Sequence, residues 1–161
     1  MSVVVSDSSP IRALDHLNLT LLLQRIYGEV LVPPGVAKEL ESRASALPPL
    51  DCTAIPGLRI QAPRDAKQVQ HLQQTLDQGE SEAIVLALEV GAAALLVDER
   101  AARSVALSLG LKPVGVLATL VRAKEIGMIP AVKPLMDRLR AGIGFRISPA
   151  LYAEIARLAA E

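Results

Sequence analysis

The 161-residue sequence predicts an α/β domain with a mainly parallel central sheet flanked by helices. Hydrophobic residues make up 51% of the chain and charged residues 21%, which is enough apolar material for one buried core. Short apolar runs alternate with segments of helical period, a pattern typical of parallel strands joined by helices. The run at 93–97 is apolar without interruption, as expected for a strand covered on both faces of the sheet.

The first half of the chain supplies three of the expected strands. A β-branched run predicts a strand over residues 2–6. Helical material follows over 11–26 and is broken near Asn18, and Ser9 with Pro10 gives it a capping hydroxyl and a first-turn proline. The further elements expected here are a strand at 29–32, a helix at about 35–46, an irregular connection at 47–57 and a strand at 58–62.

The second half continues the alternation and ends in helices. A helix at 80–90 is apolar nearly all round, which predicts a buried element, and Ser148 with Pro149 opens a capped helix. The other elements expected are a polar helix at about 65–76, strands at 93–97 and 112–116, helices at 99–109, 117–126 and 131–140, and a short extended piece at 145–147. We find no repeat or domain boundary, so we expect a single domain over 1–161 with a C-terminal helical extension at about 130–161.

The composition excludes several classes of protein and site. Lys plus Arg and Asp plus Glu are 17 each, so bulk positive charge cannot drive binding to a polyanion. One cysteine, Cys52, and two histidines argue against a disulfide framework and against zinc sites. Aromatic residues make up 2%, too few for a nucleic-acid surface built on rows of stacking rings. No segment has the pattern of an export signal or a membrane span, so we expect a soluble cytoplasmic protein.

Charge is unevenly distributed along the chain. Residues 1–99 carry 7 basic and 13 acidic side chains, and residues 100–161 carry 10 basic and 4 acidic ones. Solvated helix faces explain most of these charges, but such a division also suits a protein that holds cations beside phosphates. No Gly-x-Gly-x-x-Gly motif follows the first strand, and neither a P-loop nor a Gly-x-Ser-x-Gly motif occurs in the sequence.

Four acidic residues occupy positions from which they could share one cleft. Asp7 directly follows the first strand, and Asp98 directly follows the continuous apolar strand. If these strands are neighbours, both carboxylates meet at the carboxyl edge of the sheet, where α/β proteins place their sites. Glu39 lies one to two turns into the helix after the second strand, and Glu82 lies in the first turn of the nearly all-apolar helix.

Each of these acids also has a structural explanation, which the sequence leaves open. Asp7 and Asp98 both precede a helix and could cap it. Glu39 could pair with Arg43 four residues later, and Glu82 could simply favour the dipole of its helix.

The neighbouring acids and the type of donor atom indicate which acids belong to the site and which metal ion would suit it. Asp77 and Glu80 form an Asp-x-x-Glu start that resembles a capping box, so Glu80 is interpreted as structural, and Glu99 likewise. A cluster made only of carboxylates suits Mg²⁺ or Mn²⁺. Such ions bind phosphate oxygens, activate water and stabilise a leaving oxygen.

An ordered series of segments extends over nearly the whole chain. It comprises Val4-Val5-Ser6-Asp7-Ser8-Ser9-Pro10, Glu29-Val30-Leu31-Val32-Pro33 with Val36 and Glu39-Leu40, Gly79-Glu80-Ser81-Glu82-Ala83-Ile84, Leu95-Leu96-Val97-Asp98-Glu99, Gly115-Val116-Leu117, Ala123-Lys124, Gly127-Met128-Ile129 and Phe145-Arg146-Ile147-Ser148. Together these segments resemble PIN-domain proteins, most closely the PIN-like branch related to VapC toxins. The resemblance implies a Rossmann-like three-layer domain with Mg²⁺- or Mn²⁺-dependent ribonuclease activity, usually in a homodimer. For toxins it also implies neutralisation by a small antitoxin protein.

The resemblance also implies which residues act. The family's acids match the four already chosen by position, and Ser8 or Ser9 matches a hydroxyl beside the first acid that can hold a metal-bound water or a phosphate oxygen. Two departures stand out. Glu82 replaces the usual aspartate, and Leu96 and Val97 stand where a polar residue often precedes the last aspartate.

We therefore expect a metal-dependent endoribonuclease. Asp7 and Asp98 would be the principal ligands, with Glu39 and Glu82 completing the set directly or through water. In-line attack of water on the scissile phosphate of single-stranded or structured RNA would leave a 3′-hydroxyl and a 5′-phosphate.

Two arginines and one rival function complete the expectation. Arg100 and Arg103, on the helix after Asp98, are candidate phosphate contacts, although exposed helix arginines are common. The alternative function is a catalytically weak or inactive PIN-like binding or assembly protein, in which the acids serve as caps and ion pairs. The zero net charge and the missing polar residue before Asp98 favour that alternative.

Overall fold

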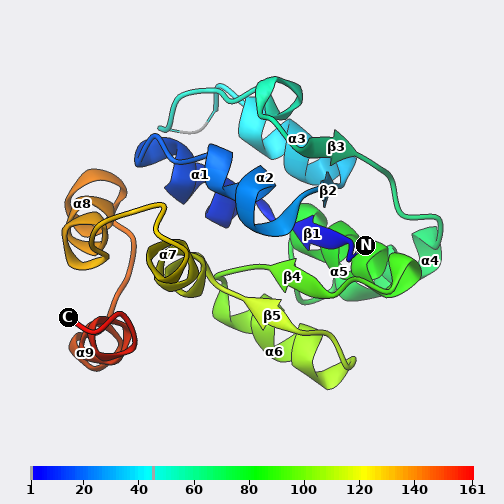
Figure 1. The fold of residues 1–161 in the computed structure, drawn as a ribbon. Coiled ribbons are helices and arrows are strands. Elements are labelled where there is room, and N and C mark those ends of the chain that lie inside the picture. The colour runs from blue at the N-terminus through cyan, green and yellow to red at the C-terminus, as the bar shows by residue number, and fades with distance from the viewer. Residues whose placement is uncertain (1, 45) are drawn as a thin grey trace.

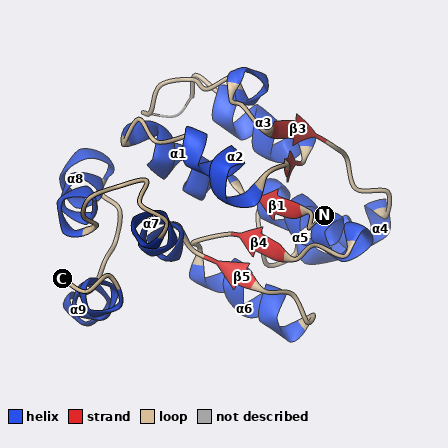
Figure 2. Ribbon diagram, viewed as in Figure 1, coloured by secondary structure: helices blue, strands red, loops and turns tan. Residues whose placement is uncertain are grey.

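Five parallel strands form the centre of the fold within residues 2–44 and 46–161, the part of the chain that the computed structural model describes (Figure 1, Figure 2). They are β1 (Val4–Ser6), β2 (Val30–Val32), β3 (Leu58–Ile60), β4 (Ala94–Leu96) and β5 (Pro113–Val114). The order across the sheet is β3-β2-β1-β4-β5, so β1 lies between β2 and β4. Val5 pairs with Leu31 on one side and with Leu95 on the other. The prediction of a mainly parallel sheet is confirmed.

Helices cover both faces of the sheet, which gives the three layers of an α/β fold (Figure 1). The helices whose buried residues join the core of the first face are α1 (Ser8–His16), α2 (Leu21–Tyr27), α3 (Pro34–Glu41), α7 (Val116–Glu125), α8 (Lys133–Ile143) and α9 (Pro149–Leu158). The second face carries α4 (Ala66–Leu72), α5 (Gln78–Val90) and α6 (Arg100–Ser108). None of the helices in the described ranges is long and apolar enough to cross a membrane.

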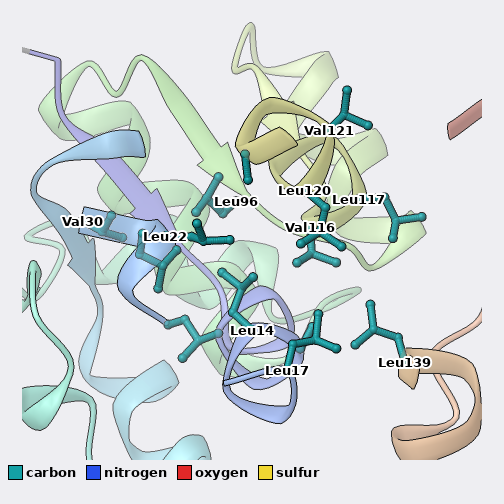
Figure 3. Close-up of a cluster of buried hydrophobic side chains, with 14 of the residues drawn as sticks. Leu14, Leu17, Leu22, Val30, Leu96, Val116, Leu117, Leu120, Val121 and Leu139 are labelled. Atoms are coloured by element: carbon teal, nitrogen blue, oxygen red, sulfur yellow. The ribbon is translucent and has the colours of Figure 1, made fainter. Parts of the chain in front are cut away.

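Alternating strand residues divide the core into two clusters. Val4 and Leu96 pack into the cluster of the first face, whereas Val5 and Leu95 pack into the cluster of the second. Side chains of the first cluster gather between α1, α2 and α7, as Figure 3 shows. Because both faces are covered, the three central strands β2, β1 and β4 are buried at every position, which explains the uninterrupted hydrophobic runs at 30–32 and 94–97.

Several element boundaries differ from the sequence predictions; for example, the helix expected at 65–76 ends at Leu72. α1 begins at Ser8 rather than after Ser9, so Asp7 takes the N-cap position. The helix expected at 35–46 ends at Glu41, because the backbone at Ser42 is extended; position 45 of that prediction lies outside the described residues. The piece at 145–147 joins no strand of the sheet in the described chain. The expected break near Asn18 is confirmed, since Asn18 has a left-handed φ of 58° and separates α1 from α2.

The packing of α8 on α1 leaves no room for a side chain at Gly142. A Cβ atom added there would lie 2.0 Å from Nε2 of His16. We expect Gly142→Ala to lower the free energy of unfolding by about 1 kcal/mol, because the His16 ring must leave its place or α8 must shift to relieve the clash. Urea denaturation measures this, with the double variant Gly142→Ala/His16→Ala as the control that removes the clash. A more stable Gly142→Ala protein, as helix propensity alone predicts, would contradict the packing.

Candidate functional site

Asp7 is a buried carboxyl at the carboxyl end of β1. Only 3% of its surface is exposed, and its side chain makes no capping hydrogen bond to α1. Its Oδ1 atom is buried without a hydrogen-bond partner among the described residues. Burial raises the pKa of Asp7 from 3.8 to about 8, although a hydrogen bond from the Ser8 N–H lowers it. Three nearby acids raise the pKa further, namely Glu80, Glu39 and Asp77.

Glu39 brings a second carboxylate to the same place from α3. A Cβ atom added to Gly79, at the start of α5, would lie 3.1 Å from Glu39 Oε2, so a glycine here lets the two helices approach. Partial burial raises the pKa of Glu39, a hydrogen bond from the Ser8 hydroxyl lowers it, and the charge of Asp77 raises it. The Ser8 hydroxyl therefore lies beside the acids, as the sequence predicted for one of its two candidate serines.

Glu80 is the first of the three acids whose charge raises the pKa of Asp7. The sequence analysis had assigned it a structural role alone. The expected capping box is present: Asp77 Oδ1 accepts from the Glu80 N–H at 2.7 Å, and Glu80 Oε1 accepts from the Asp77 N–H at 3.1 Å. Burial raises the pKa of Glu80 to about 7, and the backbone hydrogen bond of Asp77 lowers it. The box also turns the Glu80 side chain back toward the N-terminus of α5, so this carboxylate both caps the helix and adds charge near Asp7.

Glu82 points elsewhere, contrary to the expectation that it completes the carboxylate cluster. Its Oε1 atom accepts from the Gly35 N–H at 2.9 Å, and its Oε2 atom accepts from the Gln78 side-chain amide at 2.7 Å. A Cβ atom at Gly35 would lie only 2.7 Å from Oε2. Glu82 therefore fixes the N-terminus of α3 against α5 with both of its oxygens occupied.

Asp98 follows β4, which pairs with β1, so the two strand-end aspartates follow adjacent strands and the condition set by the sequence argument is met. Its Oδ1 atom accepts from the Val116 N–H at 3.0 Å, at the N-terminus of α7 rather than of the α6 helix that follows it in sequence. Its Oδ2 atom is buried and has no hydrogen-bond partner within the described ranges. Burial raises the pKa of Asp98 to about 6, while the Val116 N–H and the Arg103 charge lower it.

A cavity of about 440 Å³, the acid cavity, opens at this edge of the sheet. Among its lining residues are Ser8, Ser9, Glu39, Asp98, Phe145 and Arg146. A second cavity of about 340 Å³ shares Asp98, Phe145 and Arg146 with it and includes Arg103. Ser9 thus reaches the site by its position on the wall of the acid cavity.

The two arginines expected to bind phosphate have different surroundings. Arg103 lies on the wall of the second cavity and donates to the Val97 carbonyl at 3.0 Å. Arg100 is exposed and is not part of the wall of either cavity. Arg146, which the sequence analysis had not singled out, lines both cavities.

The acids fit a hard cation in part. Within residues 2–44 and 46–161, no group of three or more His, Cys, Asp or Glu side chains is arranged to hold a metal ion. However, Asp7 Oδ1 and Asp98 Oδ2 are buried oxygens without a partner in that part of the chain, and Asp7 lies in the field of other acids. A divalent cation would supply the missing partner and neutralise the repulsion. Holding it requires the carboxylates to turn toward one another.

Comparison with known protein families identifies the family of this chain. A family model described as PIN domain matches residues 3–161. The chain belongs to the PIN domain family. The resemblance stated on the sequence is thereby confirmed at the level of the family, and the fold is of the nuclease type. No curated protein matches this PIN domain.

Proposed function

We propose that this PIN domain is a metal-dependent endoribonuclease that hydrolyses phosphodiester bonds of single-stranded or structured RNA. One observation carries the proposal: two buried carboxylate oxygens without partners in the described chain, Asp7 Oδ1 and Asp98 Oδ2, follow adjacent parallel strands. Leaving two buried acceptors unpaired is unfavourable, so their retention favours a role that needs them free for a cation.

In this proposal the acids would hold the ion, and a neighbouring hydroxyl would hold water or the substrate. Asp7 and Asp98 would bind Mg²⁺ or Mn²⁺, with Glu39 from α3 and, in place of the expected Glu82, Glu80 from α5 completing the set directly or through water. When bound, the ion supplies charge that activates water and stabilises the leaving oxygen. The Ser8 hydroxyl, beside Glu39, would orient water or a phosphate oxygen at the wall of the acid cavity.

The protein's partners follow from the same proposal. We infer a cytoplasmic toxin-like protein that forms a homodimer and is neutralised by a small antitoxin, as the resemblance to the VapC-related branch implies. A short reading frame directly upstream of its gene would support the antitoxin, and light scattering of the purified protein would measure the dimer.

A catalytically weak binding or assembly protein is the second candidate function. It is favoured by the lack of a ready three-ligand group in residues 2–44 and 46–161 and by the capping bonds of Glu82 and Asp98. Calorimetric titration with Mn²⁺ separates the two functions. Binding that is lost in Asp98→Asn supports the nuclease, and no binding at millimolar ion supports the alternative.

Two neighbouring glutamates provide a sharp test of the ligand set. We expect Glu80→Gln to weaken Mn²⁺ binding and Mn²⁺-dependent RNA cleavage about tenfold or more, because it removes a charge close to Asp7. Glu82→Gln keeps an acceptor oxygen for the Gly35 N–H and should change either quantity less than about twofold. Cleavage of a labelled single-stranded RNA, with EDTA as the blank, measures both. The reverse order of effects would restore Glu82 as the ligand.

A further inference from the structure

The Phe145–Arg146 segment, between α8 and α9, separates the acid cavity from the second cavity. Both residues line both cavities, and Asp98 is the third residue that the two share. The segment is held at both ends. The Phe145 N–H donates to the Leu139 carbonyl at 3.1 Å, and the buried Ile147 follows Arg146. Its position beside Asp98 is therefore fixed by the packing of the C-terminal helices.

Phe145 is the aromatic ring of the chain that is placed to meet a ligand. It is the only phenylalanine, and the two tyrosines have other contacts. Tyr27 shares a 2.6 Å hydrogen bond with Thr119, and the ring of Tyr152 lies 4.6 Å beneath the Arg140 guanidinium. The Phe145 ring packs partly on the core while it lines the two cavities. A single ring can stack on one base, whereas a row of rings is needed to bind successive bases of a nucleic-acid strand.

Arg146 supplies a second positive charge at the acid cavity, where Arg12 is also on the wall but donates its N–H groups to the Pro48 and Leu40 carbonyls. Arg146 is exposed and forms no ion pair within residues 2–44 and 46–161. Glu39, Asp98 and Glu99 line the acid cavity as well, so a phosphate there needs a cation whose N–H groups are free to bind it. In the second cavity Arg103 lies on the wall together with Arg146.

We propose that Phe145 and Arg146 form a nucleotide subsite that holds one unpaired nucleotide of single-stranded RNA beside Asp98. The base stacks on Phe145 in the second cavity, and its phosphate binds Arg146 at the boundary with the acid cavity. Both cavities fall within the range of about 300–1,000 Å³ that small-ligand sites occupy. An unpaired nucleotide is required because a base inside a duplex has no free face for the ring. This inference rests on the proposed function for its RNA substrate.

The absence of tryptophan from the sequence makes the stacking directly measurable. Phe145→Trp introduces the sole tryptophan, and its fluorescence should be quenched when a short single-stranded RNA is added in EDTA. The matched ligand is an abasic oligomer of the same length, which carries the phosphates without the bases and should leave the emission unchanged. Quenching by RNA alone supports the subsite. Unchanged emission with RNA bound, or equal quenching by both oligomers, overturns it.

Binding affinity tests the second residue and keeps the inference separate from catalysis. In EDTA, fluorescence anisotropy of a labelled single-stranded RNA should show about tenfold weaker binding for Arg146→Gln and for Phe145→Leu. Arg25→Gln makes the same charge change on the exposed surface of α2, outside both cavities, and should bind within about twofold of wild type. Circular dichroism melting confirms that each variant is folded.

The outcomes distinguish this inference from the proposed function. If the wild-type protein binds RNA through Phe145 and Arg146 but does not cut it with Mn²⁺, the proposed nuclease function is wrong and the subsite proposal stands. If the wild-type protein cuts RNA while Arg146→Gln and Phe145→Leu bind RNA as tightly as wild type, only the subsite proposal is wrong. Failure of the wild type to bind single-stranded RNA overturns the subsite as well.

Discussion

Asp7→Asn should reduce Mn²⁺-dependent RNA cleavage by about a thousandfold. A divalent ion stabilises a phosphoryl transition state by several kcal/mol, and each 1.4 kcal/mol corresponds to about a factor of ten in rate. Asp7 is the most deeply buried of the proposed ligands, and its Oδ1 atom has no other partner in the described chain, so its substitution removes a donor that is free for the ion. Single-turnover cleavage of labelled RNA measures the rate.

The matched control for this result is Asp15→Asn. Asp15 lies near the C-terminal end of α1, far along the helix from Asp7 at its N-cap, and is not among the residues that line the acid cavity. The Asp15→Asn variant should cleave RNA at the wild-type rate. Equal cleavage by Asp7→Asn and wild type would indicate a contaminating nuclease and remove the basis of the proposed function.

The metal-free protein should lose stability as the pH rises from about 4 to about 8. The folded pKa of Asp7 is raised from 3.8 to about 8, so in this interval the folded state keeps a proton that the unfolded chain releases. The unfolding free energy therefore falls with rising pH and levels off above the folded pKa. Glu80, raised to about 7, and Asp98, raised to about 6, act in the same direction. One pKa unit corresponds to about 1.4 kcal/mol, so the shift of Asp7 alone corresponds to a loss of about 6 kcal/mol.

Urea denaturation between pH 5 and pH 9 in EDTA would measure this loss. Asp7→Asn should flatten the pH profile and be more stable than wild type at pH 9, because an amide keeps the hydrogen bond from the Ser8 N–H without a buried charge. Asp15→Asn should follow the wild-type profile. A wild-type protein that is most stable at pH 8 would show that Asp7 is not held protonated by its surroundings.

Much of the architecture could be predicted from the sequence because the signals are local. The strand runs, the break at Asn18, the capping box of Asp77 with Glu80 and the Ser148 cap all depend on residues close together in the chain. That both aspartates lie at the carboxyl edge of the sheet also follows from the sequence, whereas the adjacency of their strands, a condition of the sequence argument, is supplied by the structure.

The choice between Glu80 and Glu82 could not be made from the sequence. Two residues apart on a helix are about 200° apart around its axis, so only one of them can face the strand ends. An amphipathic helix would reveal which one, but α5 is apolar nearly all round and so has no such phase. The partner of Asp98 was hidden for another reason, because the N–H that it accepts from belongs to Val116, 18 residues away.

The two bonds of Glu82 have a consequence for mutational mapping. The bond from the Gly35 N–H ties α3 to α5, the helices that carry Glu39 and Glu80, and the bond from Gln78, within α5, holds the Glu82 carboxylate in place for it. An alanine scan would report Glu82 as essential for catalysis, although the truncation only lets the two helices drift apart. Glu82→Gln keeps an acceptor for the Gly35 N–H and removes the charge, so it distinguishes a residue that positions the helices from a metal ligand.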